Sequence, residues 1–237
     1  MWRRRAPNTG AKRPCMTTDP AIPPTLGLVL AGGLARRMGG GDKALIRVGG
    51  ATILDRVLAC LSAQCARVAI NANGDLSRFA DTGAPVLPDE VTGFVGPLAG
   101  VLAGLDYLAD NGAGIEWLLT VPGDCPFLPD DLVESLHRAR RSAGTPLACA
   151  KSGTWRHPVV ALWPVALRQD LRHALTDEGL RKIEVWTSRH GVAIAEWPLA
   201  PVDPFFNVNT PEDLTEAERI AAQSQPYGAI AQRIAPP

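Results

Sequence analysis

The sequence predicts an α/β fold with a mainly parallel sheet and helices on both of its faces. Short, continuously apolar runs that are typical of buried strands alternate along the chain with stretches whose apolar residues recur at helical spacing. This alternation favours parallel strands that are connected by helices. The first apolar run also leads directly into a glycine-rich turn, and sheets of this kind bind ligands at the carboxyl ends of their strands.

The expected strands are short apolar runs, and they lie at 26–30, 68–71, 86–88, 116–121, 147–150, 159–163 and 192–197. The expected helices have apolar residues on one face, and they lie at 52–63, at 97–108, from about 130, near 165–175 and near 179–189. A last helix begins after Thr210, because Thr210 suits the N-cap, Pro211 the first helical position and two acidic residues the first turn.

The composition describes an ordinary globular protein. Of the 237 residues, 46% are hydrophobic and 20% are charged, and the formal net charge is zero. A neutral chain gives no electrostatic reason to expect nucleic acid or an anionic membrane surface as a partner. No segment is long and apolar enough to span a membrane. The five cysteines include no Cys-x-x-Cys pair, so we expect reduced thiols in a cytoplasmic protein rather than a disulfide framework or a zinc site.

A single domain is expected at 25–222. Residues 1–24 contain Arg3, Arg4 and Arg5 without the apolar run of a secretory signal, and we expect them to form a disordered leader. Residues 223–237 show little pattern and are expected to form a C-terminal tail.

The segment 28–43 is the most informative motif, because an apolar strand runs into a glycine-rich turn that ends on Asp42 and Lys43. Glycines let a backbone approach a phosphate closely, and successive N–H groups in such a turn form an anion-binding concavity. Arg36, Arg37 and Lys43 add positive charge, so the turn predicts a polyphosphate ligand. The spacing fits neither a Walker A loop nor the dinucleotide-binding fingerprint, which argues against a dehydrogenase.

Further polar residues follow other predicted strands. Asn71 and Asp89 each end a strand. Asn71 could bind a base or ribose through its amide, and Asp89 could accept hydrogen bonds from a base or sugar. Gly96 and Gly100 flank a helix start, which favours an anion or a close approach of a ligand. Turn formation is the alternative interpretation of all these residues.

Asp124 ends the strand at 116–121 and is bracketed by Pro122 and Pro126. A rigid carboxylate suits Mg²⁺, which prefers oxygen ligands and usually bridges to substrate phosphates. An N-cap role is the alternative, although Asp130 and Asp131 are better placed for it. The neighbouring Cys125 has no evident histidine partner, so we expect it to pack rather than to act as a nucleophile.

His157, Asn207 and Asn209 form a weaker group of candidates. His157 precedes a predicted strand and could touch an acceptor substrate, or it could simply be a polar residue at a strand end. The two asparagines could orient a phosphate or a metal-bound water, or could only cap the last helix.

The motif at 30–43 resembles the signature of the molybdenum cofactor guanylyltransferases, Leu-Ala-Gly-Gly-x-x-x-Arg-Met-Gly-Gly-x-Asp-Lys, and fills each of its fixed positions. The resemblance extends in chain order from Leu28 to about Leu214 and implies a Rossmann-like nucleotidyltransferase. It implies transfer of GMP from GTP to the phosphate of molybdopterin, with release of pyrophosphate. It further implies Mg²⁺ as cofactor, with molybdenum cofactor delivery proteins and target molybdoenzymes as possible partners.

By match of motif, the resemblance assigns catalytic roles to Lys43, Arg37 and Asp124, with Asp124 as the metal ligand. It assigns GTP binding to residues at the ends of the first strands, namely Leu30, Ala31, Gly32, Lys43, Asn71, Asp89 and, through the metal, Asp124. Its acceptor side matches His157, Asn207 and Asn209.

Two alternatives remain open at this stage. One is a cytidylyltransferase that acts on molybdopterin or on a small phosphorylated alcohol, although such relatives tend to have Leu-Ala-Ala-Gly where this chain has a glycine pair. The other is a non-catalytic carrier of GTP or of the finished cofactor, against which a fixed metal carboxylate at Asp124 argues.

Overall fold

The computed structural model describes residues 21–32, 42–91, 96–112 and 114–223. Most of the predicted leader and tail, and the part of the glycine-rich turn that contains Arg36 and Arg37, lie outside the described residues. No described helix is long and apolar enough to cross a membrane.

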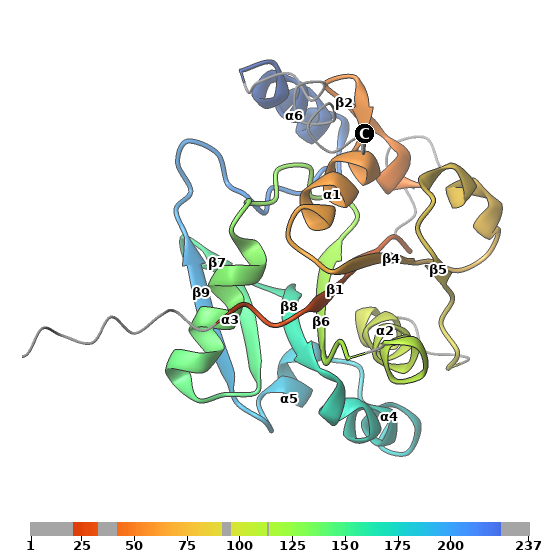
Figure 1. Cartoon of the computed structure of the whole chain (residues 1–237). Coiled ribbons are helices and arrows are strands. Elements are labelled where there is room, and N and C mark those ends of the chain that lie inside the picture. Colours follow the sequence, from red (N-terminus) through yellow and green to blue (C-terminus); the bar gives the residue numbers. More distant parts are fainter. Residues whose placement is uncertain (1–20, 33–41, 92–95, 113, 224–237) are drawn as a thin grey trace, which may run out of the picture.

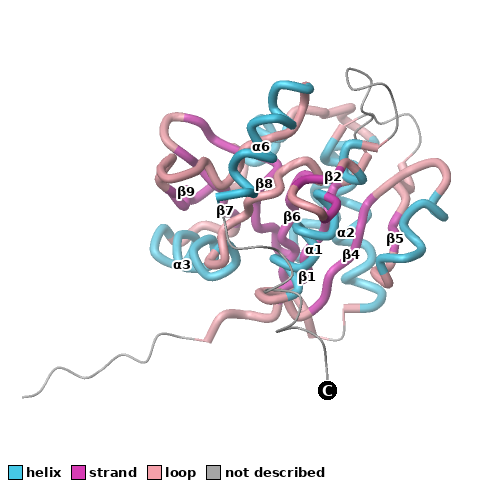
Figure 2. The backbone as a smooth tube through the Cα atoms, turned by 90° about the horizontal axis from the view of Figure 1, so that it is seen from above, coloured by secondary structure: helices cyan, strands magenta, loops and turns pink. Residues whose placement is uncertain are grey.

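A seven-stranded sheet forms the centre of the described molecule, in the order β5-β4-β1-β6-β8-β7-β9 (Figure 1). Its strands are β1 (Thr25–Leu30), β4 (Arg67–Asn71), β5 (Val86–Leu87), β6 (Trp117–Pro122), β7 (Leu147–Ser152), β8 (Trp155–Pro164) and β9 (Val192–Trp197). Strand β8 runs antiparallel to both of its neighbours, and the other pairings are parallel. The prediction of a mainly parallel sheet is therefore confirmed, and Figure 2 shows β5 and β9 at its two edges.

Helices cover both faces of this sheet, as expected from the sequence. The core of one face is formed with α1 (Ile53–Ser62), α3 (Leu132–Ala143) and α6 (Pro211–Gln223). The core of the other face is formed with α2 (Pro97–Asn111), α4 (Arg168–Thr176) and α5 (Ile183–Thr187) (Figure 1). Two buried layers of aliphatic side chains therefore hold the sheet in a fixed position, from which its strand ends present the site residues.

Helix α2 lies unusually close to the sheet because it has a glycine where it crosses β1 and β6. A Cβ at Gly104 would lie 2.7 Å from Leu28 Cδ2 and 2.9 Å from Leu118 Cδ2. Gly96 caps the helix and Pro97 occupies its first position, so the predicted start of this helix is confirmed. The close packing fixes the amino end of α2 beside the ends of the strands.

Helix α3 is joined to the sheet by a buried polar network around His137. Arg140 Nε donates to His137 Nδ1 at 3.1 Å, and His137 Nε2 lies 2.9 Å from Thr25 Oγ1. Because Thr25 Oγ1 donates to Pro23 O, the imidazole must be neutral and must donate from Nε2. Burial, followed by the positive charges of Arg140 and Arg141, lowers the pKa of His137 to about 3.

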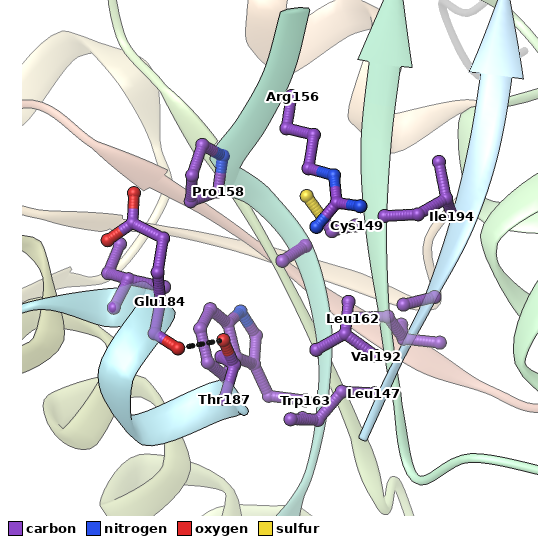
Figure 3. Close-up of a pocket in the computed structure, with 13 residues that line it drawn as sticks. Leu147, Cys149, Arg156, Pro158, Leu162, Trp163, Glu184, Thr187, Val192 and Ile194 are labelled. Carbon is purple, nitrogen blue, oxygen red and sulfur yellow. Dashed lines mark hydrogen bonds between the residues drawn. The ribbon is translucent and has the colours of Figure 1, made fainter. Parts of the chain in front are cut away.

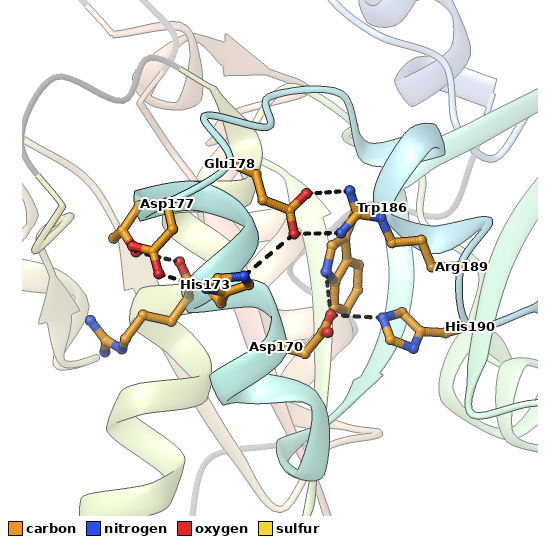
Figure 4. A network of polar contacts seen from close by, with 9 residues as sticks. Asp170, His173, Asp177, Glu178, Trp186, Arg189 and His190 are labelled. Carbon is orange, nitrogen blue, oxygen red and sulfur yellow. Dashed lines mark hydrogen bonds and ion pairs between the residues drawn. The ribbon is translucent and has the colours of Figure 1, made fainter.

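The short helix α5 is joined to α4 by a polar network (Figure 4). Asp170 on α4 accepts from Trp186 Nε1 at 2.8 Å and pairs with His190 Nε2 at 2.9 Å. Arg189 forms a two-point ion pair with Glu178 at 2.9 and 2.5 Å. The buried ring of Trp186 also packs on Trp163 of β8, so this network positions α5 over the sheet.

Several predicted boundaries need correction. The predicted helix near 179–189 is only the five-residue α5, and the helix predicted near 165–175 begins as a 3-10 turn η4 (Val165–Leu167). Strand β8 begins four residues before its predicted start at 159. The sequence reading missed the hairpin of β2 (Arg47–Val48) and β3 (Ala51–Thr52), and also the 3-10 helix η3 (Leu76–Thr82).

Candidate active site

Lys43 and Asp124 meet in one pocket at the carboxyl ends of the parallel strands. Lys43 opens the 3-10 turn η2 (Lys43–Leu45), and its Nζ lies 3.7 Å from Asp124 Oδ2. The same ammonium group donates to Asn209 Oδ1. Three segments that are far apart in the sequence thus present one cation, one carboxylate and one amide to the same point.

The ends of neighbouring strands form the floor of this pocket. The pocket encloses about 60 Å³, and its lining residues are Leu30, Ala31, Lys43, Ala44, Pro122, Gly123 and Asp124. Backbone hydrogen bonds hold the strand ends together: Gly123 N donates to Leu30 O at 3.0 Å, and Ala31 N donates to Asn71 O at 2.8 Å. The prediction that these residues converge at the carboxyl ends of the strands is therefore consistent with the geometry.

The carboxylate of Asp124 is poorly solvated, since only 17% of its side chain is exposed. Burial raises the pKa of Asp124, while the nearby charge of Lys43 acts in the opposite direction. A raised pKa means that the single ammonium group compensates the negative charge incompletely. A divalent cation would supply the missing charge.

The loop before α6 is fixed to the Asp124 segment. Val208 N donates to Asp124 O at 3.0 Å, and the buried thiol of Cys125 donates to Asn207 Oδ1 at 3.1 Å. Asp213 Oδ2 accepts from the N–H groups of Asn209 and Thr210 at 2.9 Å. Asp213 N in turn donates to Thr210 Oγ1 at 3.2 Å, so the predicted N-cap at Thr210 is confirmed as a capping box.

Asn71 and Asp89 form a second cluster on the neighbouring strand ends. Asn71 Nδ2 donates to Asp89 Oδ1 at 2.9 Å and to Leu87 O at 3.0 Å, so both of its amide hydrogens are used within the protein. Asn73 Nδ2 donates to Asp89 Oδ2 at 2.8 Å, and Asn73 Oδ1 accepts from Asp89 N at 2.9 Å. We call this arrangement of Asn71, Asn73 and Asp89 the carboxylate clamp, because two amides fix both oxygens of Asp89.

Gly100 lets α2 approach the carboxylate clamp. A Cβ at Gly100 would lie 2.3 Å from Asn71 Oδ1 and 2.9 Å from Leu30 Cδ2. No side chain larger than hydrogen fits there without moving Asn71. Packing between the helix and the strand end therefore requires the second glycine of the Gly-Pro-Leu-Ala-Gly motif.

His157 lies inside β8, rather than before a strand as expected from the sequence. Its Nε2 lies 2.8 Å from Ser152 Oγ, and its ring packs on Phe205 with centroids 4.7 Å apart. Burial lowers its pKa, although the charge of Asp203 acts in the opposite direction. Phe205 also accepts weakly from the Cys125 thiol at 3.7 Å, so His157 is linked to the Asp124 segment only through packing.

A larger cavity of about 280 Å³ lies elsewhere, between α5 and strands β7, β8 and β9 (Figure 3). Its walls are mainly apolar, and Arg156 and Glu184 lie at its edge. It shares no lining residue with the Lys43 pocket. A choice of the site by cavity volume alone would therefore miss the residues that the sequence motifs identify.

The structure brings together Leu30, Ala31, Lys43, Asp124 and Asn209, and it separately pairs Asn71 with Asp89. Gly32 is exposed and follows Ala31 of this group in the sequence. Asn207 accepts a hydrogen bond from Cys125, the residue that follows Asp124. Arg37 lies outside the described residues. The sequence reading missed the role of Asn73 in the clamp and missed Arg78 entirely, because an arginine in a polar segment gives no local signal.

Comparisons with known proteins identify the family of the chain. A family model described as the MobA-like NTP transferase domain matches residues 27–190. A molybdenum cofactor guanylyltransferase from Nitrobacter hamburgensis is 55% identical over 201 residues, which are 85% of this chain and 96% of that relative. A second relative of the same description, from Rhodopseudomonas palustris, is 56% identical over 203 residues, which are 86% of this chain and 94% of that relative.

Solved structures show the same fold. The molybdopterin-guanine dinucleotide biosynthesis protein A of Archaeoglobus fulgidus matches with a TM-score of 0.66 at 24% identity, over 84% of this chain and 100% of that one. A Mycobacterium tuberculosis protein in complex with manganese matches with a TM-score of 0.57 at 18% identity, over 84% of this chain and 100% of that one. At these identities the likeness concerns the arrangement of the sheet and its helices.

Proposed function

Because the chain belongs to the molybdenum cofactor guanylyltransferases, a family with the MobA-like NTP transferase domain, we propose that it transfers GMP from GTP to the phosphate of molybdopterin. A phosphate oxygen of the acceptor attacks the α-phosphorus of GTP, the bond to the β-phosphate oxygen breaks, and pyrophosphate leaves. The observation that supports this proposal most strongly is the meeting of Lys43 with Asp124 in one pocket at the strand ends.

The reaction needs no protein nucleophile, so the protein contributes positioning and charge. Lys43 offsets negative charge on the departing pyrophosphate, and we assign Arg37 the same task on the basis of the motif. Asn209 holds the Lys43 ammonium group by a hydrogen bond until phosphate oxygens compete for it. Leu30, Ala31 and Gly32 contribute the strand end against which the nucleotide lies.

We assign a magnesium ion to Asp124. The side chain suits a hard divalent cation, because it is a mostly buried carboxylate, with Lys43 as its ion-pair partner, at the carboxyl ends of the strands. No group of three or more His, Cys, Asp and Glu residues in the described part of the chain could hold a metal alone. Phosphate oxygens of the substrate and water would therefore complete the ligand set, as is usual for Mg²⁺, and the bound ion would polarise the phosphoryl oxygens.

We assign the guanosine to the carboxylate clamp. With the Asn71 and Asn73 amides on its two oxygens, Asp89 retains lone pairs that can accept from the N1–H and 2-amino groups of guanine. A Cβ at Gly32 would meet no described atom within 4 Å. The molybdopterin side is assigned to His157, Asn207 and Asn209.

The decisive experiment supplies the purified protein with molybdopterin, Mg²⁺ and one nucleoside triphosphate at a time. We expect pyrophosphate release only when both GTP and acceptor are present, and a product with the mass of the guanine dinucleotide. Equal or faster turnover with CTP would instead establish a cytidylyltransferase. Binding of GTP without any turnover would establish a carrier, and either result would overturn the proposal.

The setting of the reaction is proposed as the cytoplasm. The described cysteines, Cys60, Cys65, Cys125 and Cys149, are all unpaired, which fits a reducing compartment. Proteins that deliver molybdopterin and molybdoenzymes that receive the product are the proposed partners.

A further inference from the structure

Arg78 lies between the two halves of the nucleotide site and contacts both. Its Nη2 donates to Asn73 O at 2.8 Å, and its Nη1 donates to Asp75 O at 2.5 Å. Its Nε lies 2.6 Å from Asp42 Oδ2, as an ion pair without the geometry of a hydrogen bond. One guanidinium group therefore joins the segment after β4 to the residue directly before Lys43.

Two of these contacts, those with Asp42 and Asn73, lead to a residue of the proposed site through one covalent step or through hydrogen bonds. Asp42 precedes Lys43, whose ammonium group pairs with Asp124. Asn73 exchanges two hydrogen bonds with Asp89. The Arg78 bond to Asn73 O constrains the main chain of the residue whose side chain fixes Asp89.

The Arg78–Asp42 ion pair is largely shielded from water, so it can hold the two segments in a fixed relative position. Only 9% of the Asp42 side chain and 23% of the Arg78 side chain are exposed. The guanidinium group also lies 4.7 Å from the centroid of the buried Phe79 ring, which limits its freedom. Arginine suits this role better than lysine, because its planar group can serve several oxygens in fixed directions.

We propose that Arg78 is a positioning residue for nucleotidyl transfer, which sets the distance between the carboxylate clamp and Lys43. It touches neither base nor phosphate. It holds Asp42 on one side and the Asn73 main chain on the other. The carboxylate clamp, which binds the base, and Lys43, which binds the triphosphate, therefore keep a fixed distance from each other. The inference rests on the proposed function, because it assumes that one GTP spans the clamp and the lysine.

The test compares Arg78→Met with Arg138→Met, a matched control in which an ion-paired arginine is removed from the exposed surface of α3. We expect kcat/KM for GTP to fall by roughly 10- to 100-fold in Arg78→Met, mainly through KM, because small misplacements in a site have effects of that size. We expect the control to keep the parental values. Arg78→Lys should recover part of the loss, since it restores the charge opposite Asp42 but not both carbonyl contacts.

A double-mutant cycle with Asp42→Asn separates positioning from general destabilisation. If Arg78 acts through Asp42, the effect of Asp42→Asn on KM should be several-fold in the parent and should nearly vanish when Arg78 is already methionine. Additive effects on KM, or a lower Tm with unchanged KM, would overturn the proposal. If the parent protein itself releases no pyrophosphate from GTP, the proposed function fails first, and that result is distinct from failure of the Arg78 assignment.

Discussion

At the scale of single residues, the site depends on charges that are only partly balanced. Asp124 is mostly buried, its pKa is raised by burial, and Lys43 is its ion-pair partner at 3.7 Å. A carboxylate in such a position is costly unless a cation joins it. The chemistry proposed for this pocket therefore makes use of an arrangement that contributes little to stability.

Replacing Asp124 with asparagine should abolish most of the transfer reaction. We expect kcat to fall on the order of a hundredfold or more, because the amide keeps the shape but cannot hold a divalent cation with comparable charge. Steady-state pyrophosphate release at saturating GTP would measure the loss. Asp130→Asn, an exposed carboxylate on the same loop, is the matched control and should retain activity. Near-parental turnover in Asp124→Asn would remove Asp124 from the mechanism.

At the scale of elements, two glycines in the amino half of α2 allow the effect of helix packing to be distinguished from the effect on nucleotide binding. Both Gly100 and Gly104 face the sheet closely, yet their neighbours differ. A Cβ at Gly104 would press on the flexible ends of Leu28 and Leu118, whereas a Cβ at Gly100 would press on the amide of Asn71. The same kind of substitution should therefore have different consequences one helical turn apart.

We expect Gly100→Ala and Gly104→Ala to destabilise the protein to a similar extent, by about 1–3 kcal/mol each, because both overpack the interface between α2 and the sheet. Only Gly100→Ala should raise KM for GTP strongly, since it displaces Asn71 and with it the carboxylate clamp. Urea denaturation and steady-state kinetics on the two variants would measure the two effects. Equal KM values in both variants would show that Asn71 does not contribute to nucleotide binding.

The attachment of α3 to the sheet should be sensitive to acid. His137 has a pKa of about 3 in the folded protein, compared with an ordinary value of 6.5. Between these two pH values the imidazole binds a proton in the unfolded chain but stays neutral in the folded protein. Stability from this residue is therefore complete above pH 6.5 and is lost as the pH falls, by about 1.4 kcal/mol per pH unit.

The measurement is the free energy of unfolding by urea at several pH values between 7 and 5, for the parent and for His137→Gln. We expect a flatter pH dependence in the variant, because the titrating group is absent. Identical slopes in the parent and His137→Gln would contradict the role of a neutral buried imidazole.

At the scale of the whole molecule, the parts that could be predicted are those that depend on local pattern. Apolar runs identify the strands of the sheet, because burial on both faces requires them. Lys43 and Asp124 could be expected at one edge of the sheet, because parallel strands end at the same edge. The hairpin of β2 and β3 was missed because each of its two-residue strands pairs an apolar residue with a polar one, so neither forms an apolar run.

Side-chain contacts between residues that are distant in the sequence could not be predicted from local pattern. Nothing local indicates that Asn73 and Asp89, 16 residues apart, exchange two hydrogen bonds, or that Arg78 reaches Asp42. These pairings depend on how β4 and β5 align, and on where η3 returns the chain. The neighbours of His157 could not be predicted either: its ring contacts Ser152 and packs on Phe205, while its role toward the acceptor stays a prediction.

The pairing of Lys43 with Asp124 and Asn209 has one further consequence. Without substrate, the Lys43 ammonium group occupies the place beside Asp124 that the proposed metal ion would take, and the Asp124 carboxylate occupies the place beside Lys43 that a phosphate would take. Under the proposed function, an incoming triphosphate would draw the ammonium group toward itself and would leave the carboxylate without its counterion. Binding of the nucleotide and binding of the metal should therefore be coupled: each should bind more tightly when the other is present.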